Sequence, residues 1–167
     1  MSKINPRYLQ RLKPQGAASP MRRRISLLVP DLPLSRSKAG LDLVVVSVVE
    51  LGLSEETSSL ENIYSRVHEL GLALAPADTG PQLGLQYFDQ PVGEFLYVGT
   101  EPIKAKRGDA NIFIVVNGGA GLLLLGQDVR ASDQFFPSSQ FVFVRGPREH
   151  VCGHLLAYHQ SGNGKAC

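Results

Sequence analysis

Residues 41–49 (LDLVVVSVV) decide the fold of this chain. Seven of these nine residues are apolar and five are valine, a composition that favours a β-strand over a helix. The run has almost no alternation with polar side chains, which fits a strand buried on both of its faces. The stretch therefore predicts a strand inside a folded domain that begins near Ala39.

The clearest helix signals follow directly, between residues 58 and 71. Ser58 and Glu61 have the spacing of a capping box, in which the two side chains satisfy backbone amides at a helix start. Gly71 is placed to end the helix, because glycine readily adopts the left-handed conformation of a C-terminal cap. Apolar side chains recur between these signals at helical spacing: Leu60, Ile63, Tyr64, Val67 and Leu70.

Short apolar runs separated by turn residues fill the rest of the chain as far as residue 145. They predict strands at residues 83–88, 94–98, 111–116, 122–125 and 141–144. The turn at residues 89–91 joins the first two strands into a hairpin, and the glycine-rich turn at residues 117–121 joins the next two. This order predicts an α+β fold, with one main amphipathic helix packed on a mainly antiparallel sheet of about five to six strands.

Charge divides the chain into unequal parts. Residues 1–38 carry nine basic side chains, one acidic side chain and five prolines, so their net charge is +8, whereas the rest of the chain carries −6. A basic segment rich in proline buries too little apolar surface to offset the entropy of ordering it. We therefore expect a largely irregular N-terminal arm at residues 1–38, a globular domain at 39–145 and a polar C-terminal tail or edge strand at 146–167.

The composition excludes several classes of protein. A length of 167 residues suits one domain, and two cysteines are too few to hold it together as a disulfide scaffold. The longest apolar runs are a few residues, far short of the roughly 20 that cross a bilayer. A cytoplasmic protein without a transmembrane segment is expected, and its oligomeric state stays open.

The basic arm has three interpretations. Arg22, Arg23 and Arg24 favour nucleic-acid binding by neutralising phosphates. An arginine-rich segment that is poor in acids is also typical of a transit peptide. The third interpretation is a solvated tail that adsorbs to the acidic domain of its own chain, or an upstream translated extension.

The segment from Gln86 to Glu94 is the main candidate for a binding site. Its polar side chains are Gln86, Tyr87, Asp89, Gln90 and Glu94. On a hairpin loop these groups form a polar recognition surface. Alternatively, Asp89 and Glu94 act as a general acid and base if their environments separate their pKa values. Ordinary turn chemistry is the third explanation.

A metal site is a weaker candidate. His150, Cys152 and His154 lie on one side of an extended strand, and imidazole with thiolate is a credible zinc set. The usual paired ligand spacing is missing, so neither a metal nor another cofactor is predicted.

One segment of the sequence has the form GPxLxLQYxDQPxGE. The chain carries these motifs: ELGL at 50–53 and 69–72, GPQL at 80–83, LQY at 85–87, DQP at 89–91, GE at 93–94, EPI at 101–103 and FVF at 141–143. With them it resembles a group of uncharacterised bacterial proteins. Ala75, Gly84 and Phe95 depart from that pattern, where Cys, Arg and Trp are usual, so a binding role of arginine at position 84 is not carried over. The resemblance implies a bacterial cytosolic domain and no particular activity.

Together these observations favour a small non-catalytic binding module whose partner is a protein or a small ligand. A nucleic-acid-associated protein that uses its basic arm is the first alternative. A hydrolase that uses Asp89 and Glu94 is the second, and whether the chain is an enzyme stays open.

Overall fold

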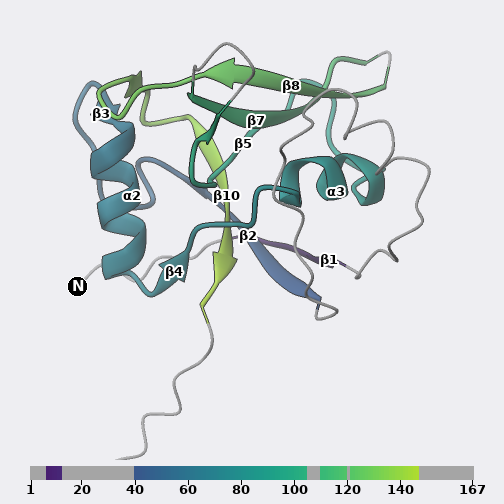
Figure 1. The fold of residues 1–167 in the computed structure, drawn as a ribbon, viewed down its shortest axis with the longest axis horizontal. Helices are drawn as coiled ribbons and strands as arrows, with labels where there is room; N and C mark the ends of the chain where they lie inside the picture. Colours follow the sequence, from purple (N-terminus) through teal and green to yellow (C-terminus); the bar gives the residue numbers. More distant parts are fainter. Residues whose placement is uncertain (1–6, 13–39, 105–109, 120, 147–167) are drawn as a thin grey trace, which may run out of the picture.

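The computed structural model describes residues 7–12, 40–104, 110–119 and 121–146. Eight strands form one sheet: β1 (Arg7–Leu12), β2 (Leu41–Ser47), β4 (Leu72–Ala73), β5 (Phe95–Val98), β6 (Ile103–Lys104), β7 (Ala110–Asn117), β8 (Leu122–Asp128) and β10 (Gln140–Arg145). A small second sheet pairs β3 (Ser58–Ser59) with β9 (Gln134–Phe135). The helices are α2 (Leu60–Glu69) and α3 (Thr79–Gln86) (Figure 1).

The large sheet is mixed rather than purely antiparallel. Its strands follow the order β1-β2-β10-β5-β7, and β8 lies on the other side of β7. The short strands β4 and β6 pair with β10 and β7. β10 runs parallel to β5, while the other pairs of this sheet are antiparallel. The α+β class is therefore confirmed, with more strands than expected and one parallel pair.

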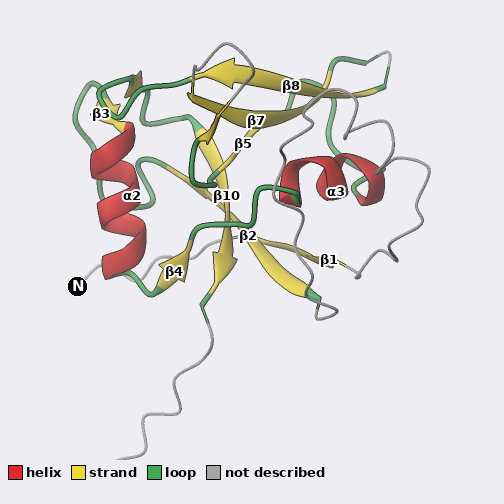
Figure 2. Ribbon diagram, in the orientation of Figure 1, coloured by secondary structure: helices red, strands yellow, loops and turns green. Residues whose placement is uncertain are grey.

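Strand β2 is buried on both faces, as its sequence predicts. Leu43 and Val45 point into one apolar cluster, whereas Val44 and Val46 point into another. This division follows the two-residue period of a strand, in which successive side chains leave on opposite faces. The sheet thus separates two cores, each covered by one helix (Figure 2).

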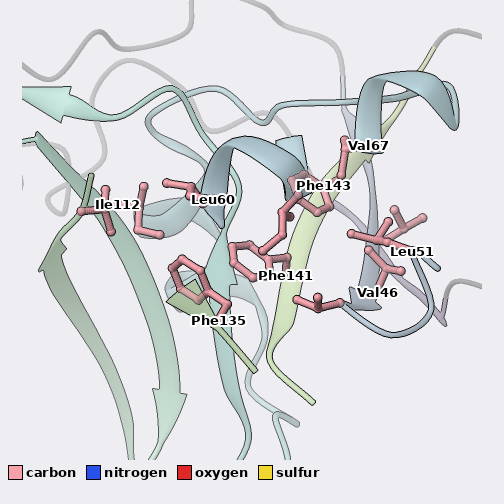
Figure 3. Packing of buried hydrophobic residues seen from close by; sticks show 12 residues of the cluster. Val46, Leu51, Leu60, Val67, Ile112, Phe135, Phe141 and Phe143 are labelled. Carbon is pink, nitrogen blue, oxygen red and sulfur yellow. The ribbon is translucent and has the colours of Figure 1, made fainter. Parts of the chain in front are cut away.

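Helix α2 covers the face of the sheet on which Val44 and Val46 lie. Its buried residues Leu60, Ile63 and Val67 pack with Phe141 and Phe143 of β10 (Figure 3). Burying large aromatic and aliphatic side chains in this way contributes about 1.5–3 kcal/mol for each side chain.

The helix begins one residue later than the capping-box spacing predicts. The N-cap is Ser59, whose Oγ accepts a hydrogen bond from the amide of Asn62 at 3.2 Å. Ser58 is instead buried in β3, where it pairs with Phe135 of β9. Gly71 follows the helix with a φ of +73°, in agreement with its predicted place at the C-terminal end.

Helix α3 covers the opposite face, and the sequence prediction for this segment was wrong. Residues 83–88 were expected to form a strand, but residues 79–86 are helical. Leu83 and Tyr87 lie four residues apart, one helical turn, and both are buried in the core beneath α3. The local sequence TGPQLGLQ contains one proline and two glycines, so tertiary packing overrides a weak helix propensity.

Strand β1 is a second element that the sequence did not predict. It lies within residues 1–38, which were expected to be largely irregular, and it pairs antiparallel with β2. Its partner is more than 25 positions away in the sequence, so no local hairpin signal announces the pairing. The second predicted hairpin is confirmed, because β7 and β8 pair antiparallel over seven residue pairs. The predicted tail at 146–167 lies outside the described residues except for Gly146.

Candidate functional site

The loop that joins α3 to β5 is held in place by a buried side chain. Gln90 is 3% exposed, and its Nε2 donates to the carbonyl oxygens of Glu94 and Val115, each at 3.1 Å. The first bond closes the loop on itself, and the second ties the loop to β7. Gln90 therefore shapes this loop from inside instead of facing a ligand on its surface.

Asn117, at the end of β7, holds the loop from the other side. Its Nδ2 donates to the carbonyl oxygen of Gln90 at 2.7 Å, and its own carbonyl accepts from the amide of Gly93 at 2.8 Å. Its Oδ1 also accepts from the amide of Gly119 at 3.0 Å, within the β7–β8 turn. One asparagine thus joins two turns that the sequence analysis treated as separate. The sequence singled out Asn117 only as a turn residue.

The structure does not bring the five predicted side chains onto one surface. Tyr87 is 7% exposed and belongs to the core beneath α3. Asp89 is exposed, whereas Gln86 and Glu94 are half-buried. Only Glu94 lines the open groove described next.

This groove has a volume of about 510 Å³ and lies beside β5. One wall comes from residues 91–95 with Tyr97, and the other comes from residues 138–140. We call it the β5 groove. The two walls are more than 40 residues apart in the sequence, and they meet because β10 pairs in parallel with β5, with Gln140 opposite Leu96.

Large apolar side chains remain exposed at the β5 groove. Val92 and Phe95 line it and are 74% and 56% exposed. Phe136, two positions before the second wall, is 65% exposed. The opposite wall is formed by three polar residues, Ser138, Ser139 and Gln140. From the sequence, Phe95 was expected only as a strand residue and as a departure from the family pattern, and no signal indicated the second wall.

The floor of the groove is connected to the core beneath α2. Tyr97 lines the groove and also stacks on Phe141, with ring centroids 5.1 Å apart. The ring of Phe135 meets Tyr97 edge-on at 5.2 Å. These ring contacts hold Tyr97 within a packed aromatic group, which limits rearrangement of its side chain.

A partly buried tyrosine that packs against the core beneath α2 is structural in character. The Tyr64 hydroxyl donates to the carbonyl oxygen of Thr100 at 2.8 Å. Burial, with a smaller contribution from Glu101, raises the pKa of Tyr64 above its ordinary value of 10.0. The phenol thus stays protonated and acts as a hydrogen-bond donor between α2 and the segment after β5.

Several predicted groups lie outside the part of the chain that the structure describes. These are Arg22, Arg23 and Arg24 of the basic arm and the weak metal set His150, Cys152 and His154. Within the described ranges, no group of three or more His, Cys, Asp or Glu side chains is arranged to hold a metal ion. None of the described helices is both long and apolar enough to span a membrane.

Comparisons with protein-family models, with curated proteins and with solved structures give no match to this chain.

Proposed function

We propose that this domain is a non-catalytic protein-binding module and that the β5 groove is its contact surface. The observation that carries the proposal is the exposure of Val92 and Phe95 in the wall of a concave site. Single apolar side chains are common on protein surfaces, but apolar side chains gathered at a hollow are typical of binding sites.

The two walls suggest the chemistry of the partner. Val92 and Phe95 offer an apolar contact, while Ser138, Ser139 and Gln140 offer hydroxyl and amide groups. This combination fits a short extended peptide segment, which has one apolar side chain to bury and backbone groups to hydrogen-bond. We therefore propose a peptide-like segment of a partner protein as the ligand.

The bonds beneath the loop support this proposal. Gln90 and Asn117 hold residues 90–94 against β7 through hydrogen bonds of 2.7–3.1 Å. A loop that is already ordered loses little conformational entropy when a ligand binds. The groove wall is thus organised before its partner arrives.

The two alternatives gain less support. A hydrolase needs Asp89 and Glu94 at one cleft, but only Glu94 lines the β5 groove, and Asp89 lies exposed outside it. Nucleic-acid binding depends on Arg22, Arg23 and Arg24, which the described ranges do not include, so it stays a prediction.

The test is a selection of linear peptides displayed on phage against the immobilised full chain. Selected peptides are then titrated against Phe95→Ser, which removes an apolar wall of the groove. Phe88→Ser is the matched control, because Phe88 is 79% exposed on the loop that leads into β5 but does not line the groove.

Peptides that bind in the groove should lose at least about tenfold in affinity with Phe95→Ser and should keep their affinity with Phe88→Ser. If no peptide is enriched, or if both variants bind the selected peptides as the wild type does, the β5 groove is not a peptide-binding surface.

A further inference from the structure

The large sheet has two outer strands in the part of the chain that the structure describes. On one side the last strand is β1. On the other side the last strand is β8, with the sequence LLLLGQD. Among the described residues, β8 pairs only with β7 (Figure 1).

Apart from the charge of Asp128 at its end, strand β8 lacks the features that prevent edge-to-edge pairing. It is seven residues long, and it contains no proline, no lysine and no arginine. Its pairing with β7 continues through all seven residues without a register shift, so no bulge turns the edge away. Because alternate residues of an edge strand direct their N–H and C=O groups outward, such a strand is a template for another strand.

Strand β8 also leaves apolar side chains in solvent. Leu123 and Leu125 are 53% and 44% exposed. They lie opposite Val116 and Ile114 of β7, and Val116 is in turn opposite Phe95 of β5. On this face an apolar row thus runs from the exposed Phe95, in the wall of the β5 groove, through the buried Val116 to the exposed Leu123 at the edge of the sheet.

We infer that a second copy of this chain pairs with β8, so that two β8 strands run antiparallel about a twofold axis at Leu124 and join two sheets into one. An antiparallel pair formed from identical strands satisfies the requirement of an isologous interface, in which each surface meets its own copy.

The positions of the leucines in β8 favour a second copy of this chain as the partner and indicate the register of the pairing. With Leu124 opposite Leu124 of the other copy, Leu123 faces Leu125 on the exposed side of the sheet, and Leu125 faces Leu123. The pairs of exposed leucines then cover one another, which stabilises adjacent strands. The strand period of two forbids a shift by one residue, because such a shift would place opposed side chains on different faces.

Charge agrees with this register. Asp128 is the only charged residue of β8, and it lies four positions from the axis. The two Asp128 side chains of the dimer are therefore about 27 Å apart, at roughly 3.4 Å per residue. This distance is well beyond the screening length of about 8 Å in physiological salt. In this register the two β8 strands bring no like charges together.

This inference is independent of the proposed peptide site. The pairing uses the outer edge of β8, whereas the β5 groove lies beside β5, which is separated from β8 by β7. If the peptide selection fails, the proposed dimer is not contradicted. If the protein is monomeric, the proposed peptide site is not contradicted.

The test is sedimentation velocity of the full chain at about 1–300 µM, with three variants compared with the wild type. Leu123→Lys with Leu125→Lys places lysines opposite lysines in the inferred register. Leu123→Lys with Leu125→Glu places each lysine opposite a glutamate. Val49→Lys is the control, because Val49 is an apolar residue that is 48% exposed away from β8. Thermal melts verify that every variant remains folded.

We expect a concentration-dependent dimer for the wild type and for Val49→Lys. The lysine pair should raise the dimer Kd at least about 100-fold, and the lysine–glutamate pair should recover most of that loss. A wild type that stays monomeric throughout, or a dimer that survives the lysine pair, overturns the inference. Equal loss in both double variants overturns the register centred on Leu124.

Discussion

Gly99, which follows β5, is in close contact with a buried aromatic ring, and replacing it with alanine tests the packing beneath α2. A Cβ at position 99 would lie against Cε1 of Phe143, 2.5 Å from its Cδ1 and 3.0 Å from its Cζ. Carbon atoms in contact are normally about 3.5–4.0 Å apart, so either the ring or the backbone must move.

Neither of these groups has room to move. Phe143 is fully buried, stacks on Phe141 with centroids 5.8 Å apart, and meets the ring of Tyr64 at 6.2 Å. The backbone of Gly99 is held on both sides, because its amide donates to Val142 at 2.9 Å and its carbonyl accepts from Ala75 at 2.7 Å. Overpacking of a core typically costs about 1–3 kcal/mol, and a site this confined belongs at the upper end.

We therefore expect Gly99→Ala to lower the free energy of unfolding by about 3 kcal/mol. For a domain of this size the melting temperature should fall by roughly 12 °C. Urea unfolding followed by circular dichroism measures the first quantity, and a thermal melt measures the second. Gly84→Ala is the matched control, because a Cβ there meets nothing within 4 Å and the residue lies inside α3. This control should be stabilised by about 0.5–1 kcal/mol.

A second variant identifies the cause of the loss. If Phe143 is the obstacle, Gly99→Ala combined with Phe143→Leu should be less destabilised than the sum of the two single changes, because contacting residues are not additive. The reasoning is refuted if Gly99→Ala unfolds within about 1 kcal/mol of the wild type, or if the two changes are strictly additive.

Two further predictions concern the hydrogen bonds described above. Gln90→Leu removes the side-chain amide that donates to the carbonyls of Glu94 and Val115, so it should lower the free energy of unfolding in urea by about 2 kcal/mol. The control Asp89→Ala, on the exposed part of the loop, should lower it by less than about 0.5 kcal/mol. Equal losses of stability would contradict the anchoring role of Gln90. Burial raises the pKa of Tyr64, so the folded protein holds the phenol proton more tightly than the unfolded chain does. The contribution of Tyr64 to the free energy of unfolding should therefore be intact below pH 10. Above pH 10 it should fall by up to about 1.4 kcal/mol per pH unit. Tyr64→Phe should lack this part of the decline between pH 9 and 11, and an unchanged slope would show that the phenol ionises freely.

The elements that could be predicted from sequence are those with local signals. The valine-rich run of β2, the cap and apolar period of α2 and the glycine turn between β7 and β8 each depend on neighbouring residues. Helix α3 and strand β1 depend instead on contacts with distant parts of the sheet. Intrinsic propensity is a weak guide to such segments, because tertiary burial decides their structure.

The candidate site shows the same limit. The sequence indicated Gln90 only as a polar group on a loop. In the structure its buried side-chain amide donates a hydrogen bond to the carbonyl of Val115, which belongs to β7, a strand distant in the sequence. The second groove wall at residues 138–140 reaches Phe95 only through the parallel pairing of β5 and β10. No spacing within either segment encodes that juxtaposition.

The position of β10 has a consequence for synthesis of the protein. β10 is the last described strand in the sequence, yet it lies in the middle of the sheet between β2 and β5, with Val144 opposite Leu43. A ribosome that makes the chain from its N-terminus must release nearly all of the domain before β2 can meet this neighbour. The growing chain therefore carries the apolar run of β2 without its central partner, and contacts so distant in sequence also form slowly. Chaperones that shield apolar segments of nascent chains have the longest opportunity to act on a sheet whose central strand arrives last.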